Sequence, residues 1–184
     1  NKMEFSFGDE VKDGELALGL HKRNSMYDIV TVDGCKIVDE DYSKILRCVY
    51  DYFKEKKIPY YHKMTHEGYL RHLLVRKTVK TKQILVDIVT STQLDFSMNE
   101  LAEKLRNLKL DGEIVGFLHT LNDSVADVVK NDRTHIIFGR DYIEEELLDL
   151  SFKITPFSFF QTNSLGAEVL YSKARDYIGS TKDK

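Results

Sequence analysis

The feature that most constrains the fold is the order in which strand-type and helix-type apolar patterns follow one another. Between residues 26 and 120 this order is strand, helix, strand, strand, helix, strand. The strand segments are short apolar runs rich in β-branched residues, whereas the helix segments repeat apolar residues at spacings of three and four. Strands are predicted over Met26–Val32, Tyr69–Arg76, Gln83–Thr90 and Glu113–Thr120, with helices between Asp39 and Pro59 and after Ser97.

This element order is that of the split βαβ or ferredoxin-like arrangement, in which an antiparallel sheet carries two helices on one face. Asp39 or Asp41 can cap the first helix, and Ser97 with Glu100 forms a Ser-x-x-Glu capping box for the second. The sequence therefore predicts an α+β fold. It predicts no chemistry by itself, because many unrelated functions share this order.

The segments on either side extend this unit. N-terminal β-hairpins, two further strands and a C-terminal helix are predicted at Met3–Phe7, Leu16–His21, Thr134–Phe138, Leu150–Ile154 and from about Asn163. We divide the chain into a β-rich N-terminal part (residues 1–35), an α+β central part (36–150) and a phenylalanine-rich segment with a linker helix (151–184). A strand pattern that starts at Asn1 and a polar tail after Gly179 predict a piece of a longer chain.

Composition excludes several classes of protein. The chain has 27 Lys and Arg against 30 Asp and Glu, so it lacks the basic excess of an autonomous nucleic-acid binder. No apolar run approaches the roughly 18 to 20 residues that span a bilayer, and the first residues lack a signal-peptide core. We therefore expect a soluble, cytoplasmic chain with no membrane partner. Motifs of the types GxGxxG, GxxxxGK[ST], HExxH and GxSxG are absent from the sequence.

Basic residues concentrate on one predicted hairpin. Arg71, Arg76, Lys77, Lys80 and Lys82 lie on its strands and at its tip, which is long enough to project into solvent. Such a tip can neutralise phosphates, so these five residues are candidates for RNA binding. A hairpin tip that is merely solvated would have the same composition, and the residues alone leave both interpretations open.

Two other clusters are weaker signals. His62 and His66 stand four residues apart, a spacing that would suit a metal on a helix, but the surrounding residues favour a loop. The acidic run from Glu144 to Glu146 is typical of a solvated face or of the first turn of a helix.

The segment PFSFFQTNS, residues 156–164, combines three phenylalanines with amide and hydroxyl side chains at the start of a helix. An apolar wall beside convergent polar groups is typical of a binding pocket. Alternatively, the phenylalanines belong to the core and Asn163 or Ser164 only caps the helix. The residue types do not decide between these interpretations.

The same segment resembles a signature of the RNA uracil-5-methyltransferases that use S-adenosylmethionine, in particular the branch that acts on 23S ribosomal RNA. The similarity covers residues 156–163 and continues over 167–171. Residues 1–7, 29–35 and 116–122 resemble further strands of the family in the same order. The resemblance therefore extends over essentially the whole chain.

The resemblance implies a central domain that is joined to an N-terminal β-barrel RNA-binding domain and a C-terminal Rossmann-like methyltransferase domain. Such an enzyme would methylate C5 of a uridine in RNA, here in 23S rRNA, using S-adenosylmethionine. In the family, the glycine-rich cofactor loop, the nucleophilic cysteine and the general-base glutamate follow the region that corresponds to this chain. We therefore expect no catalytic residue within these residues and no activity from this piece alone.

Two residues acquire roles from the resemblance. Gln161 matches the family glutamine that contacts S-adenosylmethionine, with Phe159 and Phe160 expected to anchor its loop. Cys35 matches the last of four cysteines that hold a 4Fe-4S cluster in some members. The other three would precede Asn1, so we do not expect a cluster in this chain itself. Cys48 is more simply a small packing residue.

Two alternatives to the methyltransferase interpretation remain. The chain could be a stand-alone RNA-binding module of ferredoxin-like type without catalytic activity. It could also be an interaction domain whose phenylalanine-rich segment docks a protein partner.

Overall fold

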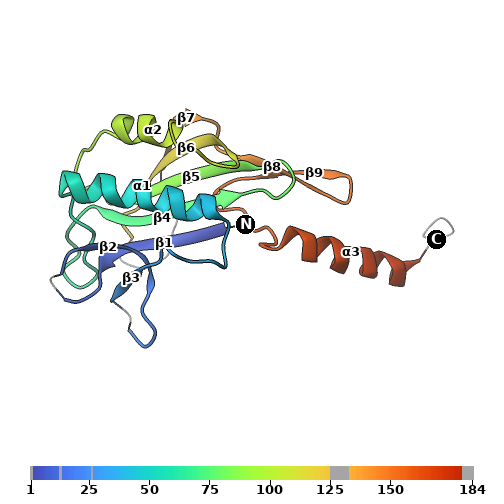
Figure 1. The fold of residues 1–184 in the computed structure, drawn as a ribbon, viewed down its shortest axis with the longest axis horizontal. Coiled ribbons are helices and arrows are strands. Elements are labelled where there is room, and N and C mark those ends of the chain that lie inside the picture. Colours follow the sequence, from blue (N-terminus) through green and yellow to red (C-terminus); the bar gives the residue numbers. More distant parts are fainter. Residues whose placement is uncertain (1, 13, 26, 125–132, 180–184) are drawn as a thin grey trace.

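The computed structural model describes residues 2–12, 14–25, 27–124 and 133–179. Asn1, Met26 and the polar tail after Gly179, which belong to predicted elements, lie outside the described residues. Within the described parts, the chain forms a seven-stranded sheet, a two-stranded sheet and three helices (Figure 1), which confirms the α+β class. The strands are β1 (Lys2–Asp9), β2 (Leu16–His21), β3 (Ile29–Thr31), β4 (Leu70–Lys77), β5 (Gln83–Thr90), β6 (Glu113–Leu121), β7 (Arg133–Gly139), β8 (Ile143–Leu147) and β9 (Leu150–Ile154). The helices are α1 (Glu40–Lys56), α2 (Asn99–Arg106) and α3 (Ser164–Ile178).

The large sheet has the strand order β3-β2-β1-β4-β5-β6-β7. The order of elements along the chain is the predicted one, but the pairing differs from the ferredoxin-like arrangement, in which the strand before the first helix lies inside the sheet. Here that strand is β3, which has only three residues and pairs at the edge with β2. The eight-residue β1 takes the place beside β4 instead. The sheet is also not fully antiparallel, because β5 and β6 are parallel and α2 connects them.

Helices α1 and α2 cover one face of the large sheet (Figure 1). The main core lies between them and the sheet, and it includes Leu46, Val49 and Phe53 of α1, Leu105 of α2 and Val86 of β5. Each fully buried side chain of this size stabilises the fold by roughly 1.5–3 kcal/mol relative to an exposed one. The apolar spacing that predicted the helices therefore corresponds to the faces that they bury.

The two predicted helix caps had different outcomes. Asp39 caps α1, since its side chain accepts a hydrogen bond from the backbone N–H of Asp41 at 3.0 Å. The reciprocal capping box at Ser97 is not formed, because α2 begins one residue later with Met98 at the cap position; the Ser97 hydroxyl accepts only a long hydrogen bond, 3.4 Å, from the backbone N–H of Asn99. Glu100 instead forms an ion pair with Lys56 of α1 at 2.7 Å.

The small sheet β8–β9 packs against the opposite face of the large sheet. Successive residues of a strand point to opposite faces, so Leu85 of β5 points away from the helices. It forms a second apolar cluster with Leu118 of β6, Ile143 of β8 and Ile154 of β9. Helix α3 extends away from the sheet (Figure 1) and buries only Ser164 and Ala167. Within the described residues, no helix combines the length and apolar character that crossing a bilayer requires.

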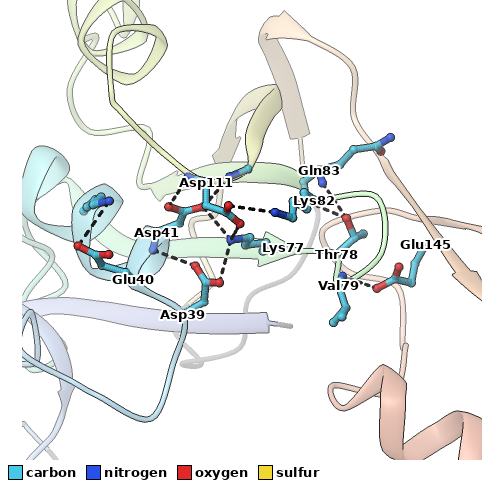
Figure 2. A network of polar contacts seen from close by, with 12 residues as sticks. Asp39, Glu40, Asp41, Lys77, Thr78, Val79, Lys82, Gln83, Asp111 and Glu145 are labelled. Carbon is cyan, nitrogen blue, oxygen red and sulfur yellow. Dashed lines mark hydrogen bonds and ion pairs between the residues drawn. The ribbon is translucent and has the colours of Figure 1, made fainter.

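An ion-pair network centred on the buried Lys77 and Asp41 joins α1, the end of β4 and the loop before β6 (Figure 2). The Lys77 ammonium lies 2.8 Å from carboxylate oxygens of Asp39 and Asp41 and 3.4 Å from Asp111. Asp41 is 1% exposed and also accepts hydrogen bonds from the backbone N–H groups of Asp111 and Gly112, each at 2.9 Å. Burial raises the pKa of Asp41, but Lys77 and the two N–H donors together hold it below its ordinary value.

Asp87 of β5 is a second buried carboxyl group, and it has no cationic partner among the described residues. It is fully buried, and one carboxyl oxygen accepts a hydrogen bond from the Thr120 hydroxyl at 2.8 Å. The other oxygen has no hydrogen-bond partner within the described parts of the chain. Burial raises the pKa of Asp87 to about 7, against the smaller lowering effect of Thr120.

We predict that Asp87 makes the fold less stable as pH rises from about 4, the ordinary pKa of the unfolded chain, to about 7. In this range the folded state keeps the proton and the unfolded state loses it, so ionisation favours unfolding. The free energy of unfolding should fall relative to that of D87N by up to about 1.4 kcal/mol per pH unit. Urea denaturation at several pH values measures this difference. A difference between the two proteins that does not change with pH would contradict the prediction.

Candidate functional site

The phenylalanine-rich segment connects β9 to α3, and Arg76 of β4 holds its first half. Arg76 is 2% exposed, and its guanidinium donates hydrogen bonds to the backbone carbonyls of Pro156, at 3.0 Å, and Ser158. The Ser158 hydroxyl accepts from the backbone N–H of Thr155 at 3.1 Å, and the two hydroxyls of these residues lie 2.7 Å apart. The backbone from Thr155 to Ser158 is therefore a closed turn bound to the large sheet.

The second half of the segment is held by one phenylalanine. Phe160 packs on Phe152 with ring centroids 5.7 Å apart and joins the apolar cluster beneath β8–β9. Phe159 is 88% exposed, so the expectation that both rings anchor the loop is corrected: only Phe160 does so. Gln161 is half-buried, and its side chain makes no hydrogen bond to any residue that the structure describes.

The segment ends at a capped helix. The Asn163 side chain accepts a hydrogen bond from the backbone N–H of Gly166 at 2.9 Å, which confirms the predicted cap of α3. The Ser164 hydroxyl donates to a carboxylate oxygen of Glu145 at 3.2 Å. The backbone is thus fixed on both sides of Gln161, while the amide of Gln161 is left available.

Glu145 of β8 connects this helix start to the tip of the β4–β5 hairpin. The residue is fully buried, and its carboxylate accepts a hydrogen bond from the backbone N–H of Val79 at 2.6 Å (Figure 2). It also accepts one from the backbone N–H of Lys80 at 3.1 Å. Charge-assisted hydrogen bonds of this kind are about twice as strong as neutral ones. The acidic run is therefore part of a strand and not a helix turn, with Glu145 buried and Glu146 on the exposed face. The sequence carried a signal for this, since Ile143, Glu145 and Leu147 occupy alternate positions, as the residues on one face of a strand do.

The structure separates the five basic candidates into two groups. Arg71, Arg76 and Lys77 are buried and bound to their own chain. Arg71 donates to the carbonyls of Asn122 and Ser124 at 2.8 and 2.7 Å. Its guanidinium also lies 4.4 Å from the centre of the Tyr61 ring.

Lys80 and Lys82 form the exposed group. Lys80 pairs with Glu168 of α3 at 2.5 Å, and Lys82 pairs with Asp111 at 3.0 Å. Their side chains are 39% and 56% exposed, respectively. These two ammonium groups are the members of the predicted basic set that face solvent.

The histidine and cysteine candidates lie apart from this segment. His62 and His66 lie in the loop between α1 and β4, where the His62 ring accepts backbone N–H groups of Met64 and Thr65 at 3.3 Å. Among the described residues, no three metal-ligating side chains come together. Cys35 is a half-buried free thiol before α1, and one thiolate does not make the four-ligand set of an iron–sulfur cluster. Burial raises the pKa of the Cys48 thiol on α1.

Comparison with solved structures shows where this fold occurs. The chain matches the crystal structure of a Pyrococcus abyssi tRNA (uracil-54, C5)-methyltransferase in complex with S-adenosyl-L-homocysteine with a TM-score of 0.73. The match covers 95% of this chain and 40% of that one. At 24% sequence identity, the likeness shows that the two proteins share this fold.

Sequence comparison gives closer relatives. No family model matches the chain. The chain is 54% identical to an uncharacterized RNA methyltransferase of Clostridium tetani and 52% identical to one of Clostridium acetobutylicum. A third, from Caldanaerobacter subterraneus, is 49% identical. The whole of this chain is therefore homologous to proteins that are named RNA methyltransferases, and it spans about two-fifths of the length of each of them.

Proposed function

We propose that this chain is the central part of an S-adenosylmethionine-dependent enzyme that methylates C5 of a uridine in 23S rRNA. The identity of 49% to 54% with proteins named RNA methyltransferases supports the class of reaction. The fold shared with a tRNA uracil methyltransferase supports uracil as the base that is methylated. The S-adenosyl-L-homocysteine bound to that protein supports S-adenosylmethionine as the cofactor. The choice of 23S rRNA rests on the resemblance of residues 156–163 to that branch of the family.

The observation that carries the proposal is the placement of Gln161. Its amide is unpaired within the described residues, on a backbone that Arg76 and the α3 cap hold in place. An amide offers both a donor and an acceptor, which suits the ammonium and carboxylate groups at the amino-acid end of S-adenosylmethionine. The cofactor supplies the activated methyl group, and the role of this chain is to hold that end of it.

We assign the proposed RNA binding to the tip of the β4–β5 hairpin. Lys80 and Lys82 can reach phosphates because their ammonium groups are partly exposed. The exposed ring of Phe159, two residues before Gln161, offers a surface on which an unpaired base can stack. Arg71, Arg76 and Lys77 would have to leave buried partners to contact RNA. Cys35 as the fourth ligand of a cluster stays a prediction about the longer protein.

The reaction itself can be tested on the full-length protein. Incubated with S-adenosylmethionine and either unmodified 23S rRNA or tRNA, it should produce 5-methyluridine in the 23S rRNA, as measured by nucleoside mass spectrometry. The 184-residue chain alone should produce none, because the family's catalytic cysteine and glutamate have no counterpart in it. Methylation of tRNA instead would overturn the substrate, and absence of 5-methyluridine from both RNAs would overturn the reaction.

We expect Q161A in the full-length protein to weaken binding of S-adenosylmethionine about 10-fold, the loss expected for hydrogen bonds to charged groups. Isothermal titration calorimetry measures the dissociation constant. Gln93→Ala is the matched control, because that amide bonds the backbone of Gly68 and His66 in another loop. An unchanged dissociation constant for Q161A would remove the proposed contact.

The double variant K80Q/K82Q should bind RNA more weakly and with a smaller salt dependence. Each lost phosphate contact to single-stranded RNA should reduce the slope of log K against log salt by about 0.7. Lys44→Gln on α1 is the control, since Lys44 pairs with Glu40 away from the hairpin. If the slope of K80Q/K82Q equals that of the control, the hairpin tip does not contact phosphates.

A further inference from the structure

The buried charge of Arg76 is not explained by ion pairing. Moving a cation into the interior is costly unless hydrogen bonds replace its water. Within the described part of the chain, the guanidinium of Arg76 pairs with no carboxylate, and its hydrogen bonds go to the carbonyls of Pro156 and Ser158. Both carbonyls belong to the segment that carries Gln161. The sequence therefore maintains a buried cation whose hydrogen bonds serve this segment.

The shape of the guanidinium suits this task. Its N–H donors form a rigid planar fork, so two of them can fix the direction of a backbone as well as its distance. Nε and Nη2 of Arg76 donate hydrogen bonds to two backbone carbonyls, which lie two residues apart on either side of Phe157. A lysine ammonium carries the same charge on a flexible stem and lacks the fork.

The position of Gln161 relative to its two anchors follows from these contacts. Ser158, held by Arg76, lies three residues before it, and Asn163, the cap of α3, lies two residues after it. Phe160 next to it is packed in the second apolar cluster. A short backbone held at both ends has few conformations, so the backbone of Gln161 is preorganised and less conformational entropy is lost when its amide binds a ligand.

We propose that Arg76 is a positioning residue for Gln161 and sets the affinity for S-adenosylmethionine without touching it. This inference rests on the proposed function, in which Gln161 contacts the cofactor. It differs from the RNA-binding role that the sequence suggested for Arg76.

A double-mutant cycle in the full-length protein tests the inference, with S-adenosylhomocysteine as a non-reacting probe in calorimetry. R76K keeps the charge but loses the fork, and we expect it to weaken binding of the probe about as much as Q161A does, about 10-fold. R76K/Q161A should bind no more weakly than Q161A, because both changes remove the same contact. In steady-state assays, R76K should raise KM for S-adenosylmethionine and leave kcat at saturating cofactor nearly unchanged.

Arg71→Lys is the matched control. Arg71 lies at the other end of β4, is buried and donates to the backbone carbonyls of Asn122 and Ser124. R71K should leave the affinity for the probe unchanged, with both variants checked for folding by circular dichroism. If R71K weakens binding as much as R76K does, the loss of affinity comes from a general disturbance of the fold, and the inference is overturned.

The other outcomes separate the inference from the proposed function. If Q161A weakens binding but R76K has no effect, or has an effect that adds fully to that of Q161A, positioning by Arg76 is overturned while the cofactor contact stands. If Q161A itself has no effect, the cofactor contact is overturned and the inference falls with it.

Discussion

The buried ammonium of Lys77 is the constraint on which the rest of the structure depends. It lies 2.8 Å from both Asp39 and Asp41, at the start of α1, and reaches Asp111 before β6 (Figure 2). A buried cation that lost these carboxylates would be strongly unfavourable, so the start of α1, the end of β4 and the loop before β6 must meet at one point. Because residues of a strand alternate between faces, fixing Lys77 toward α1 turns its neighbour Arg76 to the opposite face. There Arg76 receives the segment that carries Gln161.

The same logic extends along the hairpin beyond Lys77. The backbone N–H groups of Val79 and Lys80 point to the carboxylate of Glu145, which also accepts from Ser164 at the start of α3. Buried charges of this kind add little net stability, but the wrong register would leave them unpaired. Their effect is therefore on specificity, because they fix how α3 and its preceding segment meet the hairpin.

Most helices and strands could be predicted from the local sequence pattern. Which charged side chains are buried could not. The bounds of β2, β5 and β9 follow directly from apolar runs and turn residues. The pairing of the strands does not follow from local pattern. The element order does not say whether the three-residue β3 or the eight-residue β1 takes the place beside β4. Composition alone predicts an exposed basic hairpin, because charged residues are usually exposed. Whether Arg76 or Lys80 faces solvent depends on partners that are 80 or more residues away in the sequence.

The two exposed lysines and the buried contacts play different parts in joining the hairpin to the proposed cofactor segment. The pair between Lys80 and Glu168 of α3 is partly exposed, and exposed pairs contribute little to stability. A phosphate that binds Lys80 in place of Glu168 would therefore cost the fold little. The contacts of Glu145 and Arg76 are buried and would persist. Under the proposed function, RNA would engage the tip of the hairpin while the base of the same hairpin kept Gln161 in place, so the RNA and the cofactor would not compete for the same contacts.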